Sequence, residues 1–190
     1  MRYGSERVDL DILSAGLTPL TDRPCIATIG TFDGLHQGHR AVVAATRAAA
    51  DEQGCRAVAV TFDPRPETVL RPAEALPDLV PVNERVEALL AAGMDHVVVL
   101  RFSMGLAKLP AEQFIGRLRG LMDLRLLCVG ADFAFGRNKS VNALAVAAMG
   151  LKVRVVPLVA GMDDAAKASS TNIRRAIARG VNRREAAAFA

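Results

Sequence analysis

The chain has 190 residues and a hydrophobic content of 51%, which excludes general disorder and allows one domain with a sizeable core. No apolar run approaches a membrane span, and the first residues lead into no signal-peptide core, so we predict a cytoplasmic protein without a membrane partner. The net charge of +4 suits anionic nucleotides or nucleic acids, but aromatic residues reach only 4% and no recognition motif is present, so we expect no nucleic-acid partner.

Strands and helices are expected to alternate along the chain. Residues 1–20 are weakly patterned, with a short edge segment between Val8 and Leu13. Apolar runs predict five strands, at residues 25–29, 57–62, 96–101, 126–129 and 152–156. Helices are predicted at residues 41–53, 83–92, 109–119, 142–149, 172–179 and 183–189, with Asn83 as an N-cap and Gly120 as a stop signal. Such alternation implies right-handed crossovers and a parallel sheet, which binds ligands beyond the carboxyl ends of its strands.

Residues 30–39, called here the histidine turn, follow the first expected strand and contain two of the three histidines, His36 and His39. Three glycines in this turn would let the backbone approach a ligand closely. The helix that follows would offer its N-terminus to phosphate groups. The spacing is neither a Walker A loop nor a dinucleotide fingerprint. We therefore expect a nucleoside triphosphate here, with both imidazoles donating hydrogen bonds as charge builds in the transition state.

Unusual residues also follow the second and fourth expected strands, at 63–66 and 130–137. Because parallel strands end at one edge of a sheet, these loops and the histidine turn are predicted to meet in space. Ser169, Ser170 and Thr171 would cap a basic helix that carries Arg174 towards the β- or γ-phosphate.

Simpler explanations exist for each feature. A histidine near a helix start can be a solvated cap, two prolines can merely end a strand, and Phe133 and Phe135 can be ordinary core. The three cysteines are scattered without a C-x-x-C pair, so a structural zinc site is not expected. No Ser–His–Asp or Cys–His arrangement supports covalent catalysis.

Four segments carry a resemblance to known proteins. The histidine turn is similar to the G-x-F-D-x-x-H-x-G-H signature of the nucleotidylyltransferase superfamily, matched by Gly30, Phe32, Asp33, His36, Gly38 and His39. Residues 62–70 resemble the F-x-P-x-P-x-x-x-L segment of bacterial FAD synthetases, and residues 129–136 their V-G-x-D-F-x-F-G segment. Residues 169–174 match the S-S-T-x-I-R motif that FAD synthetases share with other nucleotidylyltransferases.

The resemblance implies a Rossmann-like nucleotidylyltransferase fold, with a five-stranded parallel sheet flanked by helices, as a single domain over residues 1–190. It also implies FMN adenylylation, in which AMP passes from ATP to FMN to give FAD and pyrophosphate, with Mg²⁺ accompanying ATP. FMN and FAD are then substrate and product. The oligomeric state is left open.

The same resemblance implies roles for individual residues. Catalytic roles fall on His36, His39 and Arg174. ATP-binding roles fall on Gly30, Thr31, Phe32, Asp33, Gly34, Gly38, Lys167, Ser170 and Thr171. Flavin-binding roles fall on Phe62, Pro64, Pro66, Asp132, Phe135 and Lys139. No metal-binding residue is expected.

The chain departs from the family pattern in two respects. Where family members often continue F-G-x-x-R-x-G, this chain has Lys139 and Val141 in place of the arginine and the last glycine. That difference leaves open another phosphorylated acceptor, or a non-catalytic flavin- or nucleotide-binding protein. Family members also commonly carry a riboflavin kinase module, and because no G-R-x-L-G-x-P-T-A-N-like segment is present we expect no kinase activity.

Overall fold

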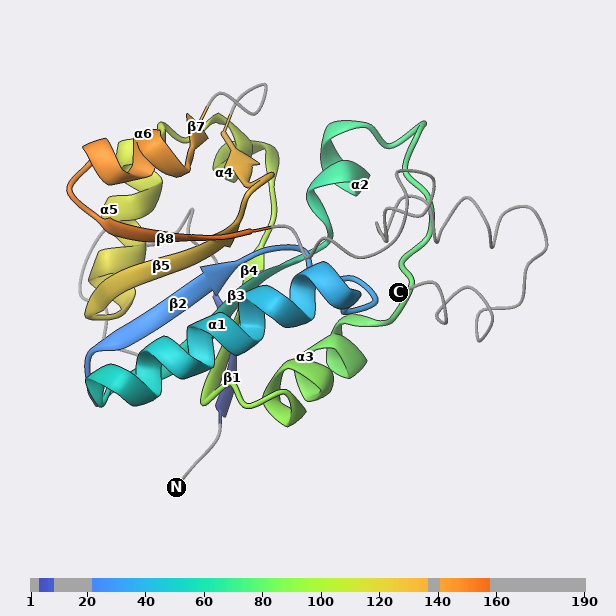
Figure 1. Ribbon diagram of the computed structural model, residues 1–190. Helices are drawn as coiled ribbons and strands as arrows, with labels where there is room; N and C mark the ends of the chain where they lie inside the picture. The colour runs from blue at the N-terminus through green and yellow to red at the C-terminus, as the bar shows by residue number, and fades with distance from the viewer. Residues whose placement is uncertain (1–3, 9–21, 137–140, 158–190) are drawn as a thin grey trace.

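The computed structural model describes residues 4–8, 22–136 and 141–157 and contains the parallel sheet expected from the sequence (Figure 1). The expected strands are β2 (Cys25–Ile29), β3 (Arg56–Asp63), β4 (His96–Arg101), β5 (Leu124–Gly130) and β8 (Lys152–Val156). The described residues add a sixth strand, β1 (Gly4–Val8), which gives the parallel order β1-β4-β3-β2-β5-β8. The Rossmann-like α/β class is confirmed. The sheet exceeds the expected five strands because β1 pairs through its backbone with β4 and needs no apolar pattern.

Helices cover both faces of the sheet (Figure 1). On one face lie α1 (Gln37–Gln53) and α3 (Val82–Ala91), and on the other α4 (Met104–Lys108), α5 (Ala111–Leu121) and α6 (Ala143–Ala148). Strand β2 shows why its sequence is continuously apolar: Ile26 packs with Val43 of α1, whereas Ala27 and Ile29 belong to the cluster around α5. Both faces of the strand are therefore buried.

Several helix boundaries differ from the predictions. Helix α1 begins at Gln37 rather than at residue 41, because the side chain of His36 caps it. The N-cap of α3 is Pro81, so Asn83 lies inside the first turn. Gly120 lies within α5 instead of ending it, since the helix continues to bury Leu121. Helix α6 spans Ala143–Ala148 within the predicted 142–149, because Asn142 is its N-cap, with its side chain accepting the N–H of Ala145.

Four short elements were not predicted, because each is too short to show a periodic pattern. Helix α2 (Pro66–Leu70) follows β3, and α4 follows β4. Strands β6 (Ala134–Phe135) and β7 (Val141–Asn142) pair antiparallel after β5. The helices predicted at residues 172–179 and 183–189 lie outside the described residues.

The strand order defines where a ligand is expected. Starting from β2, the next strands along the chain, β3 and β4, lie on one side of it, whereas β5 and β8 lie on the other side. The direction of winding therefore changes between β2 and β5, and in such sheets ligands bind in the crevice at this point. The histidine turn follows β2, residues 131–136 follow β5, and residues 63–66 close β3 on the other side of β2. These segments leave the same edge of the sheet because the three strands are parallel, and their meeting in space stays a prediction.

A separate polar cluster lies at the opposite edge of the sheet. Asp95, just before β4, accepts the N–H of Ala57 at 2.8 Å and pairs with Arg47 of α1 at 2.7 Å. Burial alone would raise the pKa of Asp95, but these two partners lower it below the ordinary value of 3.8. The ionised carboxylate thus ties α1 to the first residues of β3 and β4.

We expect Asp95→Asn to weaken the acid sensitivity of the fold. A lowered folded-state pKa means that Asp95 stabilises the protein above the unfolded pKa and loses this contribution as the pH falls through the folded pKa. Urea unfolding should show a larger loss of stability between about pH 7 and about pH 3 in the wild type than in the variant. Equal losses would contradict this role.

The assignment of the core can be tested with two leucines that differ in burial. Leu100 of β4 is 0% exposed, whereas Leu144 of α6 is 80% exposed. Leu100→Ala should lower the free energy of unfolding by about 2–5 kcal/mol, and Leu144→Ala by less than about 0.5 kcal/mol. Denaturant titrations of the two variants check this difference, and similar losses would contradict the assignment of the core.

Candidate active site

The histidine turn has a strained backbone. Phe32 and Leu35 adopt positive φ angles of 48° and 41°, and Gly34 has a φ of 85°. Left-handed backbone at residues other than glycine costs about 1–3 kcal/mol each and persists only where the surroundings hold it. The Phe32 ring is buried and packs over Gly30, where an added Cβ would lie 3.1 Å from the ring. Strain of this kind is concentrated at functional sites.

The two imidazoles lie together at the first turn of α1. His36 is the N-cap, and its Nδ1 accepts the backbone N–H of His39 at 3.4 Å. The rings stack with centroids 3.7 Å apart, and the Phe32 ring meets His39 edge-on at 5.2 Å. Because Nδ1 of His36 is an acceptor, the neutral ring carries its proton on Nε2. That N–H is the donor this ring would offer to a phosphate.

Gly38 is required by the position of the His36 ring. An added Cβ at residue 38 would lie 3.3 Å from both Cε1 and Nδ1 of His36. That distance is tighter than ordinary van der Waals contact, so the ring would have to move. The glycine therefore allows the imidazole to lie against the helix backbone.

The rest of the turn is tied to β3 and to residues 71–81. Thr61 donates its hydroxyl to the carbonyl of Thr31 at 3.0 Å. The Asp33 carboxylate is 0% exposed and accepts the N–H groups of Leu79 and Val80 at 3.0–3.1 Å. Asp33 was expected among the ATP contacts, but its carboxylate binds the chain itself. Any part that it plays in ATP binding is therefore through the position of the turn.

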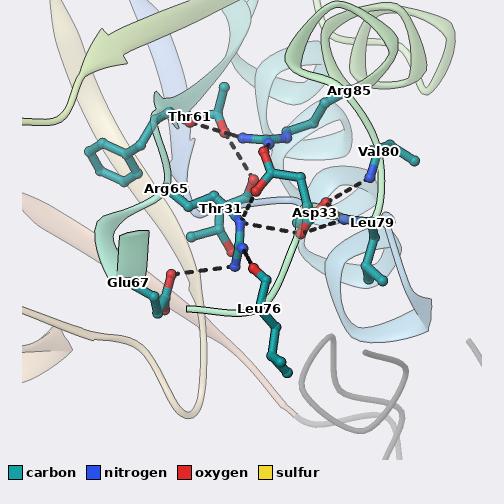
Figure 2. A network of polar contacts seen from close by, with 11 residues as sticks. Thr31, Asp33, Thr61, Arg65, Glu67, Leu76, Leu79, Val80 and Arg85 are labelled. Atoms are coloured by element: carbon teal, nitrogen blue, oxygen red, sulfur yellow. Dashed lines mark hydrogen bonds and ion pairs between the residues drawn. The ribbon is translucent and has the colours of Figure 1, made fainter. Parts of the chain in front are cut away.

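A buried charged network surrounds Asp33, and sequence reasoning missed it (Figure 2). Arg65 lies 3.5 Å from Asp33 and donates hydrogen bonds to the carboxylate of Asp78 and the carbonyl of Leu76. Arg85 of α3 lies 3.4 Å from Asp78. Both guanidinium groups are buried. No sequence signal marks them, since Arg65 stands between two prolines and Arg85 in a polar helix.

Arg85 connects this network to the end of β3. Its Nη1 donates to the carbonyl of Phe62 at 2.9 Å and to the Thr61 hydroxyl at 3.4 Å. Burial lowers the pKa of Arg85, opposed by the charges of Asp33 and Asp78. A guanidinium remains charged under all ordinary conditions, so the carboxylates are its necessary counter-ions.

The expected flavin-binding residues come from two strand ends on either side of β2. Phe62 at the end of β3 is half-buried against Phe102, with ring centroids 5.7 Å apart. Pro64 follows a cis peptide bond and is exposed, and Pro66 begins α2. These positions leave part of each side chain accessible at the carboxyl edge of the sheet.

The loop after β5 provides two further expected flavin-binding residues, Asp132 and Phe135. Asp132 is exposed, and a Cβ at Gly130 would meet its Oδ1 at 3.0 Å. Phe135 of β6 is half-buried, with its ring 5.4 Å from Phe114 and 5.6 Å from Phe133. Both aromatic residues of this loop therefore pack partly on the core and keep an exposed part.

Several candidate residues lie outside the described residues: Lys139, Lys167, Ser170, Thr171 and Arg174. The catalytic role of Arg174, the ATP-binding roles of Lys167, Ser170 and Thr171, and the flavin-binding role of Lys139 therefore stay predictions. In the described part of the chain, no three or more His, Cys, Asp or Glu side chains gather as a metal site would require. None of the helices there is both long and apolar enough to cross a bilayer.

The protein-family model of FAD synthetase matches residues 18–172. The chain belongs to the FAD synthetase family. The bifunctional riboflavin kinase/FMN adenylyltransferase of Listeria monocytogenes is 30% identical over 164 residues, which is 84% of this chain and 52% of that protein. A Geobacillus thermodenitrificans protein, provisionally named for the same two activities, is 35% identical over 155 residues, 82% of this chain and 83% of its own. The chain spans about half the length of most of the curated relatives it matches.

Two solved structures resemble this chain over most of its length. A Streptococcus pneumoniae structure described as a macrolide-efflux protein has a TM-score of 0.76 and 27% identity, over 91% of this chain and 55% of that chain. Francisella tularensis pantoate-beta-alanine ligase, at 12% identity and a TM-score of 0.52 over 86% of this chain and 67% of that chain, shares the fold alone. The nucleotidylyltransferase-like fold expected from the histidine turn is therefore confirmed.

We expect Gly38→Ala to damage the site of this FAD synthetase family member without weakening its fold. Alanine favours a helix over glycine by about 1 kcal/mol, but its Cβ would push the His36 ring away. Thermal unfolding should show unchanged or raised stability, while ATP binding measured by calorimetry should weaken. Gly116, inside α5 with no atom near an added Cβ, provides the matched control Gly116→Ala. Equal ATP affinity in both variants would contradict the proposed constraint.

Proposed function

We propose that this chain is an FMN adenylyltransferase that transfers AMP from ATP to FMN, giving FAD and pyrophosphate, and that residues 1–190 act as one domain. The observation that carries the proposal is the stacked pair of imidazoles at the N-terminus of α1, beside the point where the sheet changes its winding direction. Membership in the FAD synthetase family supports the choice of substrates.

The triphosphate of ATP would lie over the N-terminus of α1. Backbone N–H groups at a helix N-terminus and the helix dipole attract phosphate. The imidazoles of His36 and His39 would donate hydrogen bonds to phosphate oxygens as their charge increases in the transition state. Lys167, Ser170, Thr171 and Arg174 would add contacts from the opposite side.

The reaction needs no general base. The FMN phosphate is largely dianionic near neutral pH, its second pKa being about 6. One of its oxygens forms a bond to the α-phosphorus of ATP, while the bond from that phosphorus to the bridging oxygen breaks and pyrophosphate leaves with the electron pair. No proton is transferred in this step. The chain has to align the reactants and stabilise charge, which suits a site of imidazoles and guanidinium groups.

The flavin would bind between the ends of β3 and β5. Phe62, Pro64 and Pro66 on one side and Phe135 on the other would offer apolar surface to the ring. Asp132 is exposed and would accept a hydrogen bond from the flavin. Lys139 would also contribute to flavin binding.

Mg²⁺ would accompany ATP. Such ions are usually held by substrate phosphates and one or two carboxylates. When bound, the ion neutralises phosphate charge. The alignment of the phosphates depends on the chain's own groups at the start of α1.

A second acceptor is favoured by one observation, the replacement of the family's usual arginine and glycine by Lys139 and Val141. Val141 pairs with Phe135 in the hairpin of β6 and β7, so this change lies beside a proposed flavin contact. If FMN is inert and another phosphorylated compound accepts AMP, the transferase chemistry holds and the acceptor changes.

We expect mass analysis to detect FAD and pyrophosphate after incubation with ATP, Mg²⁺ and FMN. His36→Ala and His39→Ala should each lower kcat by about 10²–10³-fold, because each removes a donor to the transition-state charge. The matched control is His96→Ala, since His96 begins β4 at the opposite edge of the sheet. The mechanism is wrong if both turn variants react at the wild-type rate. Tight ATP and FMN binding without turnover by the wild type would instead indicate a non-catalytic binding protein.

A further inference from the structure

Residues 71–81 connect α2 to α3 and lie against the histidine turn (Figure 2). The N–H groups of Leu79 and Val80 donate to the Asp33 carboxylate at 3.0–3.1 Å. The Leu79 side chain lies over Gly34, where an added Cβ would be only 2.9 Å from Leu79 Cδ1. Two backbone donors and one apolar contact therefore join this segment to the middle of the turn.

Three charged side chains fix the segment from its other side. Asp78 accepts a hydrogen bond from Arg65, which also donates to the carbonyl of Leu76. The second oxygen of Asp78 lies 3.4 Å from Nη2 of Arg85. Asp78 is 38% exposed, whereas both guanidinium groups are buried. Asp78 is thus the member of the network that can be changed with least disturbance of packing.

We propose that Asp78 and Arg65 are positioning residues, which hold residues 71–81 on Asp33 and thereby keep the histidine turn in its strained, nucleotide-binding conformation. Asp33 stands between Phe32 and Leu35, the two residues with positive φ angles. Such angles persist only where the surroundings impose them. Asp33 is the side chain of this turn that accepts hydrogen bonds from residues 71–81. His36 follows directly after Leu35, so relaxation of the turn would move the imidazoles. The inference rests on the proposed function, because it assigns the network a task in ATP use.

Four variants test this proposal. Asp78→Asn removes the charge, Asp78→Glu keeps it at a partly exposed position, and Arg65→Lys keeps the charge but loses the planar fork that spans Asp78 and Leu76. Asp95→Asn is the matched control, because it breaks a comparable ion pair, that with Arg47, at the opposite edge of the sheet.

The first measurement is amide hydrogen exchange of Leu79 and Val80, which does not depend on activity. Asp78→Asn and Arg65→Lys should speed exchange of these two amides by about tenfold or more, because the free energy of opening residues 71–81 away from Asp33 is then lower. Asp78→Glu should restore slow exchange, and Asp95→Asn should leave it unchanged. Exchange as slow as in the wild type for both Asp78→Asn and Arg65→Lys would overturn the proposal.

The second measurement is steady-state kinetics with ATP and FMN. Misplaced imidazoles should raise KM for ATP and lower kcat, so that kcat/KM falls by about 10- to 100-fold in Asp78→Asn. A merely structural loss would reduce the amount of folded enzyme and the apparent kcat while KM for ATP stays the same. Faster amide exchange with an unchanged KM for ATP would therefore also overturn the proposal. If the wild type forms no FAD, that result contradicts the proposed function and not the positioning role. In that case, a Kd for ATP that rises in Asp78→Asn but not in Asp95→Asn would still support the positioning role.

Discussion

The backbone N–H of His39 donates to Nδ1 of His36, and this hydrogen bond fixes where α1 begins. Because the bond is local, the helix starts within a few residues of the end of β2, at the carboxyl edge of the sheet. Both imidazoles and the helix N-terminus then lie together beside the end of β2. The glycine at residue 38 leaves room for the capping ring beside the helix. The proposed binding of anions rests on the geometry of this one turn.

Such a compact turn requires support, and the chain provides it with buried charges. Asp33, Arg65, Asp78 and Arg85 bring together two carboxylates and two guanidinium groups, so their formal charges balance. Buried ion pairs contribute little net stability, because the loss of hydration offsets their attraction, and they are better suited to fixing one conformation. Their placement beneath a strained turn agrees with that use. The protein thus combines an apolar parallel sheet, which supplies stability, with a polar network, which sets local geometry.

Much of the fold could be predicted, because buried parallel strands are continuous apolar runs and stand out in the sequence. Strands β2, β4 and β8 have the boundaries expected from the pattern alone. An edge segment was expected between Val8 and Leu13, whereas β1 spans Gly4–Val8, since an edge strand held by backbone pairing needs no apolar pattern. Helices α2 and α4 are too short to show a period. Gly120 was misinterpreted as a stop because tertiary burial of Leu121 outweighs the low helix propensity of glycine.

The candidate site was predictable to the extent that its residues are adjacent in the chain. His36, Gly38 and His39 form a local motif, and the structure stacks the two imidazole rings with centroids 3.7 Å apart. The network of Arg65, Asp78 and Arg85 joins residues distant in sequence, and no local pattern reports such contacts. Asp33 illustrates the difference, since its place in the motif was evident whereas its partners, the amides of Leu79 and Val80, were not.

The proposed function depends above all on ATP phosphates binding at the start of α1, where the stacked imidazoles would hold them. A crystal structure of the chain with a non-hydrolysable ATP analogue and FMN would show whether they do. We expect phosphate oxygens within hydrogen-bond distance of His36 and His39, with Arg174 on the opposite side of the triphosphate and the flavin near Phe62 and Phe135. A triphosphate bound elsewhere, or imidazoles facing away from both it and Arg174, would contradict this binding mode.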